Sequence, residues 1–266
     1  MMNVVELEKL TREACGIIAS VGEFIRGEIG KVGADMVEEK SLHSLVSYVD
    51  RGAEERLVRE LGRLLPGATF LTEEETVETM QSPTQWIIDP LDGTTNFLHQ
   101  LPVFAISVAL QEEGQTVLGI VLEINRSELF YAWQGGGAYL NGKPIRVTAT
   151  TDLENALLAT GFPYYDYDQI ANYLEALSVF MQVTRGIRRM GSAAVDLAYV
   201  ACGRFDAFFE YSLHAWDVAA GALLVQEAGG HVSDFSGGDN YLFGGEIIAS
   251  NLGVYNDVLR VLSESF

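Results

Sequence analysis

The spacing of apolar residues changes near residues 66–67, and this change limits the possible folds of the chain more than any other feature. Before it, residues 4–29 and 50–65 carry apolar side chains at steps of three and four, which predicts two amphipathic helices. After it, short apolar runs are separated by turn residues, which is typical of strands. The predicted strands of this first half cover residues 69–72, 85–89, 104–111, 116–123, 129–133 and 144–147.

The three long runs in the middle of this group are predicted to form antiparallel neighbours, and Asn141-Gly142 predicts a tight hairpin turn. The second half alternates strand and helix patterns, which indicates a sheet covered by helices and an α/β fold class. Its predicted elements, strand first, cover residues 156–160, 168–183, 186–189, 192–202, 205–210, 217–228, 246–250 and 253–263. We expect two layered subdomains, residues 1–150 and 151–266, with a cleft between them.

The charge balance narrows the range of partners. The chain has 17 Lys and Arg against 37 Asp and Glu, a formal net charge of −20, and a field of that sign repels nucleic acid and anionic membrane surfaces. Cys15 and Cys202 lie far apart without a metal-binding spacing, which indicates a reducing compartment and no zinc site. Residues 1–9 lack the apolar run of a signal peptide, and the longest uncharged stretch, 93–111, is interrupted by polar residues. We therefore expect a cytoplasmic protein without a membrane span.

The segment at 86–97 (WIIDPLDGTTNF) carries the strongest chemical signal. An apolar strand ends at Asp89, the following proline restricts the backbone, and Asp92 comes within the same turn. Two carboxylates this close can face one point and share cations, and the carbonyl of Leu91 adds a hard oxygen ligand. Gly93 permits close backbone approach, and a helix that starts after it would aim N–H groups at an anion. The segment therefore predicts a phosphate cradle beside a metal site.

A simpler interpretation is that Asp89 and Asp92 organise a turn and that Thr94 or Thr95 caps a helix. A single Asp-Gly pair would favour that interpretation. The combined order of strand, two aspartates, Gly-Thr-Thr and Asn-Phe favours the metal and phosphate site.

Two further acidic positions become candidates for the same site when they are considered together with this segment. Glu73 follows a predicted strand within an acidic loop, and taken alone it favours a solvated loop. Asp217 lies at a predicted helix start, and taken alone it favours an N-cap. Beside the aspartates of 86–97, both become candidates for the same site.

Four segments, in matching order and spacing, resemble the signature segments of the inositol monophosphatase family of magnesium-dependent, lithium-sensitive phosphatases. They are FLTEEE at 70–75, WIIDPLDGTTNF at 86–97, IRRMGSAA at 187–194 and HAWDVAAG at 214–221. The resemblance extends over nearly the whole chain. It implies a layered α/β/α/β/α sandwich, usually a homodimer, whose partner is a small phosphate monoester.

The resemblance also implies roles for individual residues. The metal ligands would be Glu73, Asp89, the carbonyl of Leu91, Asp92 and Asp217. Thr94, with Asp50 behind it, would orient the attacking water, and Glu73 would help to deprotonate it. The substrate contacts would be Glu73, Leu91, Asp92, Gly93, Thr94, Arg188, Gly191, Ser192, Ala193, Glu210 and Asp217. For Arg188, ion pairing with the many acidic residues is an equal alternative.

The charge count supports magnesium independently. Four carboxylates in one cleft need compensation, and two or three Mg²⁺ ions, about +4 to +6, would supply it. Ligands that are all oxygen favour Mg²⁺ over zinc. Ser44 stands where many family members carry an aspartate, so the third metal site is left open, while Thr72 replaces a common glycine with little consequence. We predict direct attack of a metal-activated water on the phosphorus of myo-inositol 1-phosphate or a related polyol or sugar phosphate, without a covalent phosphoenzyme.

Three alternatives compete with this prediction. A haloacid-dehalogenase phosphatase needs a second aspartate two residues after the first, and position 91 is leucine. Within the family, fructose-1,6-bisphosphatase, 3′(2′),5′-bisphosphate nucleotidase and histidinol-phosphate phosphatase are the rival activities. A catalytically silent scaffold that binds a partner is the alternative outside enzymes.

Overall fold

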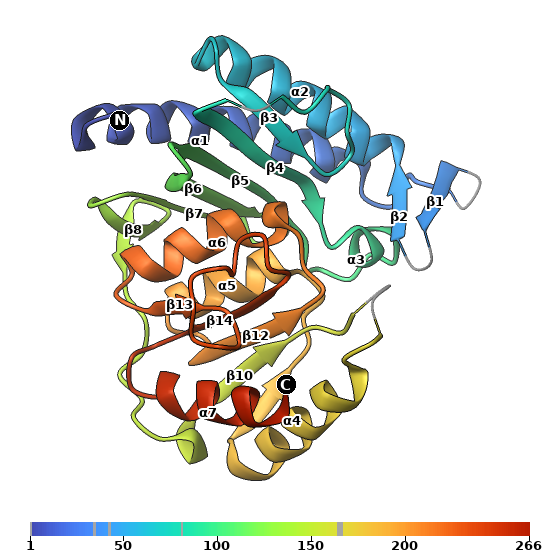
Figure 1. Ribbon diagram of the computed structural model, residues 1–266. Coiled ribbons are helices and arrows are strands. Elements are labelled where there is room, and N and C mark those ends of the chain that lie inside the picture. Colours follow the sequence, from blue (N-terminus) through green and yellow to red (C-terminus); the bar gives the residue numbers. More distant parts are fainter. Residues whose placement is uncertain (1, 34–35, 42–43, 81, 164–166) are drawn as a thin grey trace.

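A seven-stranded sheet forms the upper half of the molecule (Figure 1). The computed structural model describes residues 2–33, 36–41, 44–80, 82–163 and 167–266. In spatial order the strands are β3 (Thr69–Thr72), β4 (Thr84–Asp92), β5 (Ala105–Glu112), β6 (Gln115–Glu123), β7 (Glu128–Trp133), β8 (Gly137–Leu140) and β9 (Lys143–Ile145). The first two strands run parallel, and every later neighbour pair is antiparallel, as predicted for the central strands.

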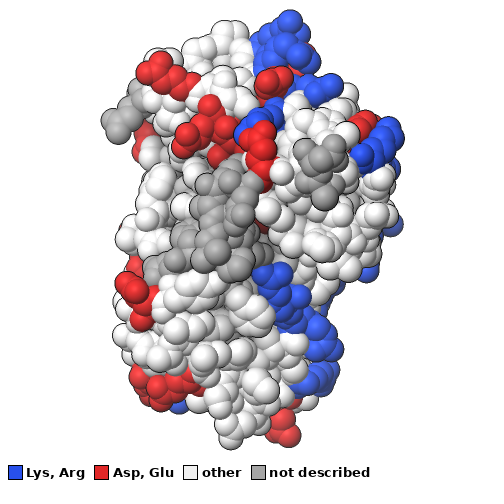
Figure 2. Space-filling model, turned by 90° about the vertical axis from the view of Figure 1, so that its right-hand side faces the viewer, with Lys and Arg blue, Asp and Glu red and all other residues white. Residues whose placement is uncertain are grey.

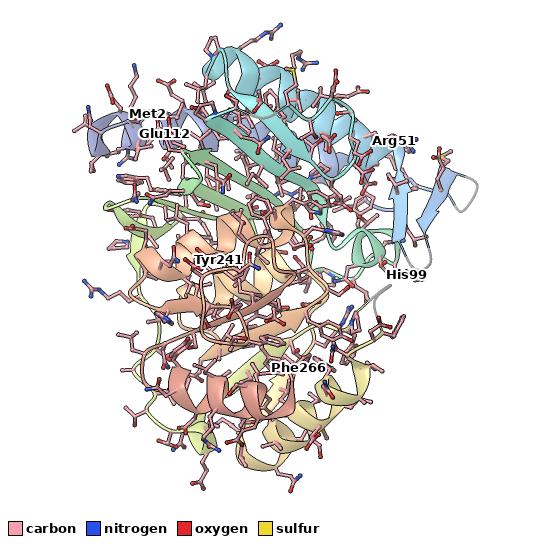
Figure 3. The ribbon with its side chains drawn as sticks, in the orientation of Figure 1. Met2, Arg51, His99, Glu112, Tyr241 and Phe266 are labelled. Atoms are coloured by element: carbon pink, nitrogen blue, oxygen red, sulfur yellow. The ribbon has the colours of Figure 1, made fainter. Side chains whose placement is uncertain are left out.

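Two amphipathic helices cover the outer face of this sheet, close to the predicted ranges. They are α1, Val4–Glu28, and α2, Tyr48–Leu64, and each begins with a capping box. Their apolar stripes form one core with sheet residues such as Trp86. The main-chain N–H of Met2 donates a hydrogen bond to Glu112 at 2.7 Å, which attaches the start of α1 to the end of β5 (Figure 3).

The second sheet has five strands in the order β11-β10-β12-β14-β13. Their bounds are β10 (Leu157–Thr160), β11 (Gly186–Arg188), β12 (Ala207–Tyr211), β13 (His231–Ser233) and β14 (Glu246–Ser250). Its outer face is covered by α4, Ile170–Val183, and α7, Tyr255–Ser265. Between the two sheets lie α5, Ala193–Ala201, and α6, Ala215–Glu227 (Figure 1). The layers are therefore α/β/α/β/α, as the resemblance implied.

Glycines let the central helices approach their neighbours closely. A Cβ on Gly119 of β6 would lie 2.7 Å from the carbonyl oxygen of Ala220, and one on Gly221 would lie 2.4 Å from the Cβ of Leu197. Any side chain at these positions would push α6 away from the first sheet or from α5. Because α5 and α6 pack against both sheets, the two predicted subdomains share one core, and their division at residue 150 stays a prediction.

Several short elements were not predicted. They are β1 (Val37–Ser41), β2 (Ser44–Ser47), β8, β13 and the 3₁₀ helix Leu153–Asn155. Each has three to five residues, too few to display a hydrophobic period. The Asn141-Gly142 hairpin is confirmed, because both residues have positive φ, 48° and 81°, and they join β8 to β9.

Surface charge is distributed unevenly. On the face drawn in Figure 2, acidic side chains lie in the upper part and at the lower left, and basic side chains run along the right-hand side. At the start of α2, Arg51 forms an ion pair with Glu38 of β1 at 2.6 Å (Figure 3). Within the described ranges, each helix is too short or too polar to cross a membrane.

Candidate active site

A bulge in β4 brings Asp89 and Asp92 to the same face of the seven-stranded sheet. Residues three apart in a regular strand point to opposite faces. Here Asp89 pairs with Ser107 and Asp92 pairs with Ala105, so three steps along β4 match two steps along β5. Because the two partners are two residues apart, they share a face, and the aspartates opposite them do as well. The strand therefore continues past its predicted end at residue 89, and the bulge aims both carboxylates toward α6.

Gly93 then turns the chain into the short helix α3, Thr94–Leu98. Its φ is 94°, in the left-handed region that favours glycine. A Cβ at this position would lie 3.1 Å from the carbonyl oxygens of both Gly191 and Val103. Gly93 thus lets the start of α3 lie directly against the loop that precedes α5.

Thr94 and Asp50 are in contact, as the resemblance implied. The Thr94 hydroxyl lies 2.9 Å from Oδ1 of Asp50 and 3.1 Å from the carbonyl oxygen of Leu91. Asp50 is buried at the start of α2, where its other oxygen accepts hydrogen bonds from the N–H and hydroxyl of Ser47 at 2.8 and 2.7 Å. Burial raises the pKa of Asp50, and these hydrogen bonds oppose the shift. The hydroxyl proton of Thr94 therefore has acceptors on two sides, and the oxygen keeps lone pairs for a further donor.

Asp217 reaches the site from the first turn of α6. The helix begins two residues before the predicted start, and His214 is its N-cap, so the N-cap interpretation of Asp217 is wrong. Instead, Oδ2 of Asp217 accepts a hydrogen bond from the main-chain N–H of His214 at 2.7 Å. One oxygen from each of Asp89, Asp92 and Asp217 lies within 4.8 Å of the other two. Three acids from two distant segments thus converge on one point.

This convergence is electrostatically unfavourable for the ionised acids. Burial is the largest cause of the raised pKa values of Asp89, Asp92 and Asp217, and mutual repulsion adds to it. The pKa of Asp92 is raised to about 6, although hydrogen bonds from Ser192 and Ala194 oppose the shift. Such crowding of buried carboxylates is typical of a site that holds cations.

Glu73 completes the acidic group at the end of β3. Its main-chain N–H donates to the carbonyl oxygen of Ile88 at 3.2 Å, which extends the β3–β4 pairing by one residue. Its side chain makes a hydrogen bond with Asp89 that raises the pKa of Asp89. Glu73 is therefore a fourth acid beside the three that converge, and it adds to the negative charge that a cation would neutralise.

The loop that carries Glu73 is held by a buried residue that the sequence analysis did not identify. Glu54 of α2 accepts hydrogen bonds from the main-chain N–H groups of Glu74 and Thr76, both at 2.8 Å, and from the hydroxyl of Thr76 at 2.7 Å. The sequence did contain a signal for this role, because a glutamate stands on the apolar stripe of the predicted helix. Its carboxylate replaces the sheet partners that the acidic loop lacks.

The loop before α5 supports Asp92 directly. Ser192, the N-cap of α5, donates its hydroxyl to Oδ2 of Asp92 at 2.7 Å, and the N–H of Ala194 donates to the same oxygen at 2.7 Å. The amide of Asn96 in α3 donates to the carbonyl oxygens of Met190 and Val103 at 2.9 and 2.7 Å. The bonds to Asp92 and the bond from Asn96 to Met190 join the first half of the chain to the second across the site.

These groups line one cleft with a volume of about 420 Å³. Its lining includes the expected residues Glu73, Asp89, Leu91, Asp92, Gly93, Thr94, Gly191, Ser192, Ala193, Glu210 and Asp217, and also Arg189, Asp196, His214 and Trp216. Arg188 is exposed, lies outside this lining, and donates a hydrogen bond to the carbonyl oxygen of Ile187. Its neighbour Arg189, which is also exposed, is the arginine that lines the cleft.

Mg²⁺ fits this donor set. The converging groups offer carboxylate and carbonyl oxygens, which are the ligands that hard divalent cations prefer, and the clustered acids need positive charge. The side chain of Ser44 lies outside the described part of the chain, so its effect on a third metal site stays a prediction.

Comparisons with known proteins agree over nearly the full length. The chain is 45% identical over 248 residues to Nus factor SuhB of Pseudomonas aeruginosa, covering 91% of this chain and 92% of that protein. It is 42% identical over 244 residues to inositol-1-monophosphatase of Mesorhizobium japonicum, with coverage of 91% and 92%. The crystal structure of the extragenic suppressor protein suhB from Bartonella henselae superimposes with a TM-score of 0.90 at 39% identity, covering 97% of this chain and 99% of that one.

The Thermotoga maritima IMPase is also similar, with a TM-score of 0.87 at 35% identity and coverage of 95% of this chain and 96% of that one. A family model described as the inositol monophosphatase family matches residues 6–265. With this match and the bulged aspartate pair opposite Asp217, the chain belongs to the inositol monophosphatase family.

Proposed function

We propose that this protein is a magnesium-dependent phosphomonoesterase that hydrolyses myo-inositol 1-phosphate or a related polyol or sugar phosphate. The observation that carries the proposal is the convergence of Asp89, Asp92 and Asp217 within 4.8 Å in a cleft beside Gly93 and Thr94. The relative named inositol-1-monophosphatase, 42% identical over 244 residues, supports this substrate.

The proposed metal ligands are Glu73, Asp89, the carbonyl of Leu91, Asp92 and Asp217, which would hold two or three Mg²⁺ ions. When bound, these ions supply the positive charge that activates water and stabilises the oxygen that leaves. The chain's own contribution is to hold the ligands in place, through the β4 bulge, the Ser192 hydroxyl and the first turn of α6.

Thr94, Asp50 and Glu73 are the proposed water-handling residues. The Thr94 hydroxyl lies 2.9 Å from Oδ1 of Asp50, so its oxygen can accept a hydrogen bond from water while its proton is donated away. Glu73 would receive the proton that this water loses. The main-chain N–H groups of Gly93 and Thr94 would bind phosphate oxygens, and Glu210 would face the alcohol.

The related activities remain alternatives for the substrate. Fructose 1,6-bisphosphate or adenosine 3′,5′-bisphosphate would each place a second phosphate in the cleft. Among the described residues that line the cleft, Arg189 is the one arginine or lysine, so the cleft offers little positive charge of its own to a second phosphate. We therefore rank a substrate with one phosphate first.

A second candidate function is binding to a partner protein. One observation favours it, the 45% identity over 248 residues to a relative named Nus factor SuhB. Such binding is compatible with catalysis, whereas a catalytically silent scaffold is not.

Phosphate release from a set of four esters tests the proposal. Inositol 1-phosphate, fructose 1,6-bisphosphate, adenosine 3′,5′-bisphosphate and histidinol phosphate would be compared with Mg²⁺, without it, and with Mg²⁺ plus Li⁺. We expect Mg²⁺-dependent release, fastest from inositol 1-phosphate and inhibited by Li⁺. A folded, Mg²⁺-binding protein that releases no phosphate from any ester would favour the silent scaffold.

The homodimer and the cytoplasmic location stay predictions, to be checked by light scattering and cell fractionation.

A further inference from the structure

Asp196 is a buried acid in the cleft to which the proposed mechanism assigns no role. It lies in α5, whose sequence AAVDLAYVA is otherwise uncharged, and its exposed fraction is 1%. It lines the same cleft as the acidic cluster. A single acid in an apolar helix was the sequence signal that could have drawn attention to it.

The side chain of Asp196 is incompletely satisfied. Its Oδ1 is buried and has no hydrogen-bond partner among the residues that the structure describes. Burying a polar oxygen without a partner lowers the stability of the fold, so an apolar residue of similar size would stabilise this position. An acid that costs stability and borders the active-site cleft is expected where a ligand provides the missing hydrogen bond.

The neighbouring charges define what that ligand can be. Glu210 and Asp92 raise the pKa of Asp196, after burial as the largest cause, while Arg189 lowers it. Glu210 is 6% exposed, and a Cβ on Gly161 would lie 2.0 Å from its Oε1, so the backbone at residue 161 approaches this carboxyl closely. Two carboxyl groups and one guanidinium therefore share this part of the cleft.

Hydroxyl groups suit such a mixed lining better than ions do. A hydroxyl both donates to a carboxylate and accepts from a guanidinium or a protonated acid. A second phosphate would find one guanidinium to pair with and two acids beside it, and an ammonium group would be repelled by Arg189.

We infer that Asp196 is a specificity-determining residue whose carboxyl group, beside that of Glu210, binds hydroxyl groups on the alcohol part of the phosphate ester. The inference rests on the proposed function and deepens it. It adds Asp196 to Glu210, which the proposed function already assigns to the alcohol.

The test compares two esters in the full-length protein with Mg²⁺. Inositol 1-phosphate carries hydroxyl groups beside the ester, and p-nitrophenyl phosphate carries none. In Asp196→Leu we expect kcat/KM to fall by roughly 3- to 10-fold for inositol 1-phosphate, as for loss of a hydrogen bond, and to change little for p-nitrophenyl phosphate. Asp196→Asn, which retains hydrogen-bonding atoms, should recover most of the loss.

Thermal unfolding separates this role from a structural one. The Tm of Asp196→Leu should equal or exceed that of the wild type, because the unpartnered oxygen is removed. Asp206 is the matched control, since it is also buried but accepts hydrogen bonds from the Thr148 hydroxyl at 2.6 Å and the N–H of Leu157 at 2.7 Å, away from the cleft. Asp206→Leu should lower the Tm without changing the ratio of the two kcat/KM values.

Equal losses on both esters, or no loss on either, in Asp196→Leu would overturn the inference. Wild-type protein that hydrolyses neither ester with Mg²⁺ would instead contradict the proposed function. The two failures are therefore distinguishable in one set of measurements.

Discussion

The hydroxyl of Ser107 donates a hydrogen bond to the main-chain carbonyl of Trp216 at 3.0 Å. Ser107 is the strand partner of Asp89, and Trp216 directly precedes Asp217. This one bond therefore joins the sheet that carries two acidic residues to the helix that carries the third.

Replacing Ser107 should weaken metal binding without removing a ligand. In Ser107→Ala we expect a loss of about 1 kcal/mol in unfolding free energy and a rise of roughly fivefold in the Mg²⁺ concentration for half-maximal activity. Ser250→Ala is a control, because that buried hydroxyl also donates to a main-chain carbonyl, that of Asn251 at 2.9 Å, away from the cleft. Equal Mg²⁺ requirements in the two variants would contradict a positioning role for Ser107.

Asp92 is the acid whose removal should separate catalysis from folding. Asp92→Asn keeps the shape of the side chain but removes a charge from the cluster, so phosphate release should fall by roughly 1000-fold or more. The Tm in EDTA should stay the same or rise, because repulsion among the acids is reduced. Calorimetric titration with Mg²⁺ should show weaker or fewer binding events. Activity retained in Asp92→Asn would show that Asp92 is not a metal ligand. The control is Asp239→Asn, because Asp239 is exposed.

Glu210 should make stability depend on pH in a defined direction. Burial raises its pKa from 4.5 to about 8, with Asp92 adding to the shift and Arg189 opposing it. Between these two pH values the folded state holds a proton on Glu210 that the unfolded state releases. The contribution of Glu210 to the free energy of unfolding is therefore complete below pH 4.5 and is lost as the pH rises to about 8.

The variant Glu210→Gln has no such proton. Its unfolding free energy should therefore increase relative to wild type as the pH rises from about 4.5 to 8, measured by urea denaturation in EDTA at fixed ionic strength. For the exposed control Glu154→Gln, the difference in unfolding free energy from wild type should stay constant across this pH range. A constant difference for Glu210→Gln as well would show that its pKa is not raised in the folded protein.

Glu54 should be necessary for the loop that carries Glu73. In Glu54→Gln, an amide N–H₂ replaces one acceptor oxygen opposite N–H donors, so we expect a loss of about 2–3 kcal/mol in unfolding free energy. Activity should fall further than stability alone explains, because the position of Glu73 is disturbed. Glu60→Gln is the control, as its pair with Arg63 at 3.0 Å is solvent-exposed and contributes little. Hydrogen exchange at residues 74–76 should increase only in the Glu54 variant.

Local patterns determined much of this protein. The apolar spacing at residues 4–29 and 50–65 was sufficient for α1 and α2, because a helix face repeats within a few residues. The Asn141-Gly142 turn was predictable for the same reason, since its backbone conformation depends on two adjacent residues. The acids of 86–97, Glu73 and Asp217 were recognisable as a set from their residue types and from the family resemblance.

Tertiary structure alone decided how those acids meet. Asp89 and Asp92 share a face only because β5 sets the register across a bulge, and register depends on the partner strand rather than on β4 itself. Three other features likewise depend on groups far away in sequence. Arg189 rather than Arg188 lines the cleft, Glu54 binds the acidic loop, and one oxygen of Asp196 has no partner among the described residues. Sequence specifies which groups are available, while packing determines the distances and the desolvation that give those groups their chemistry.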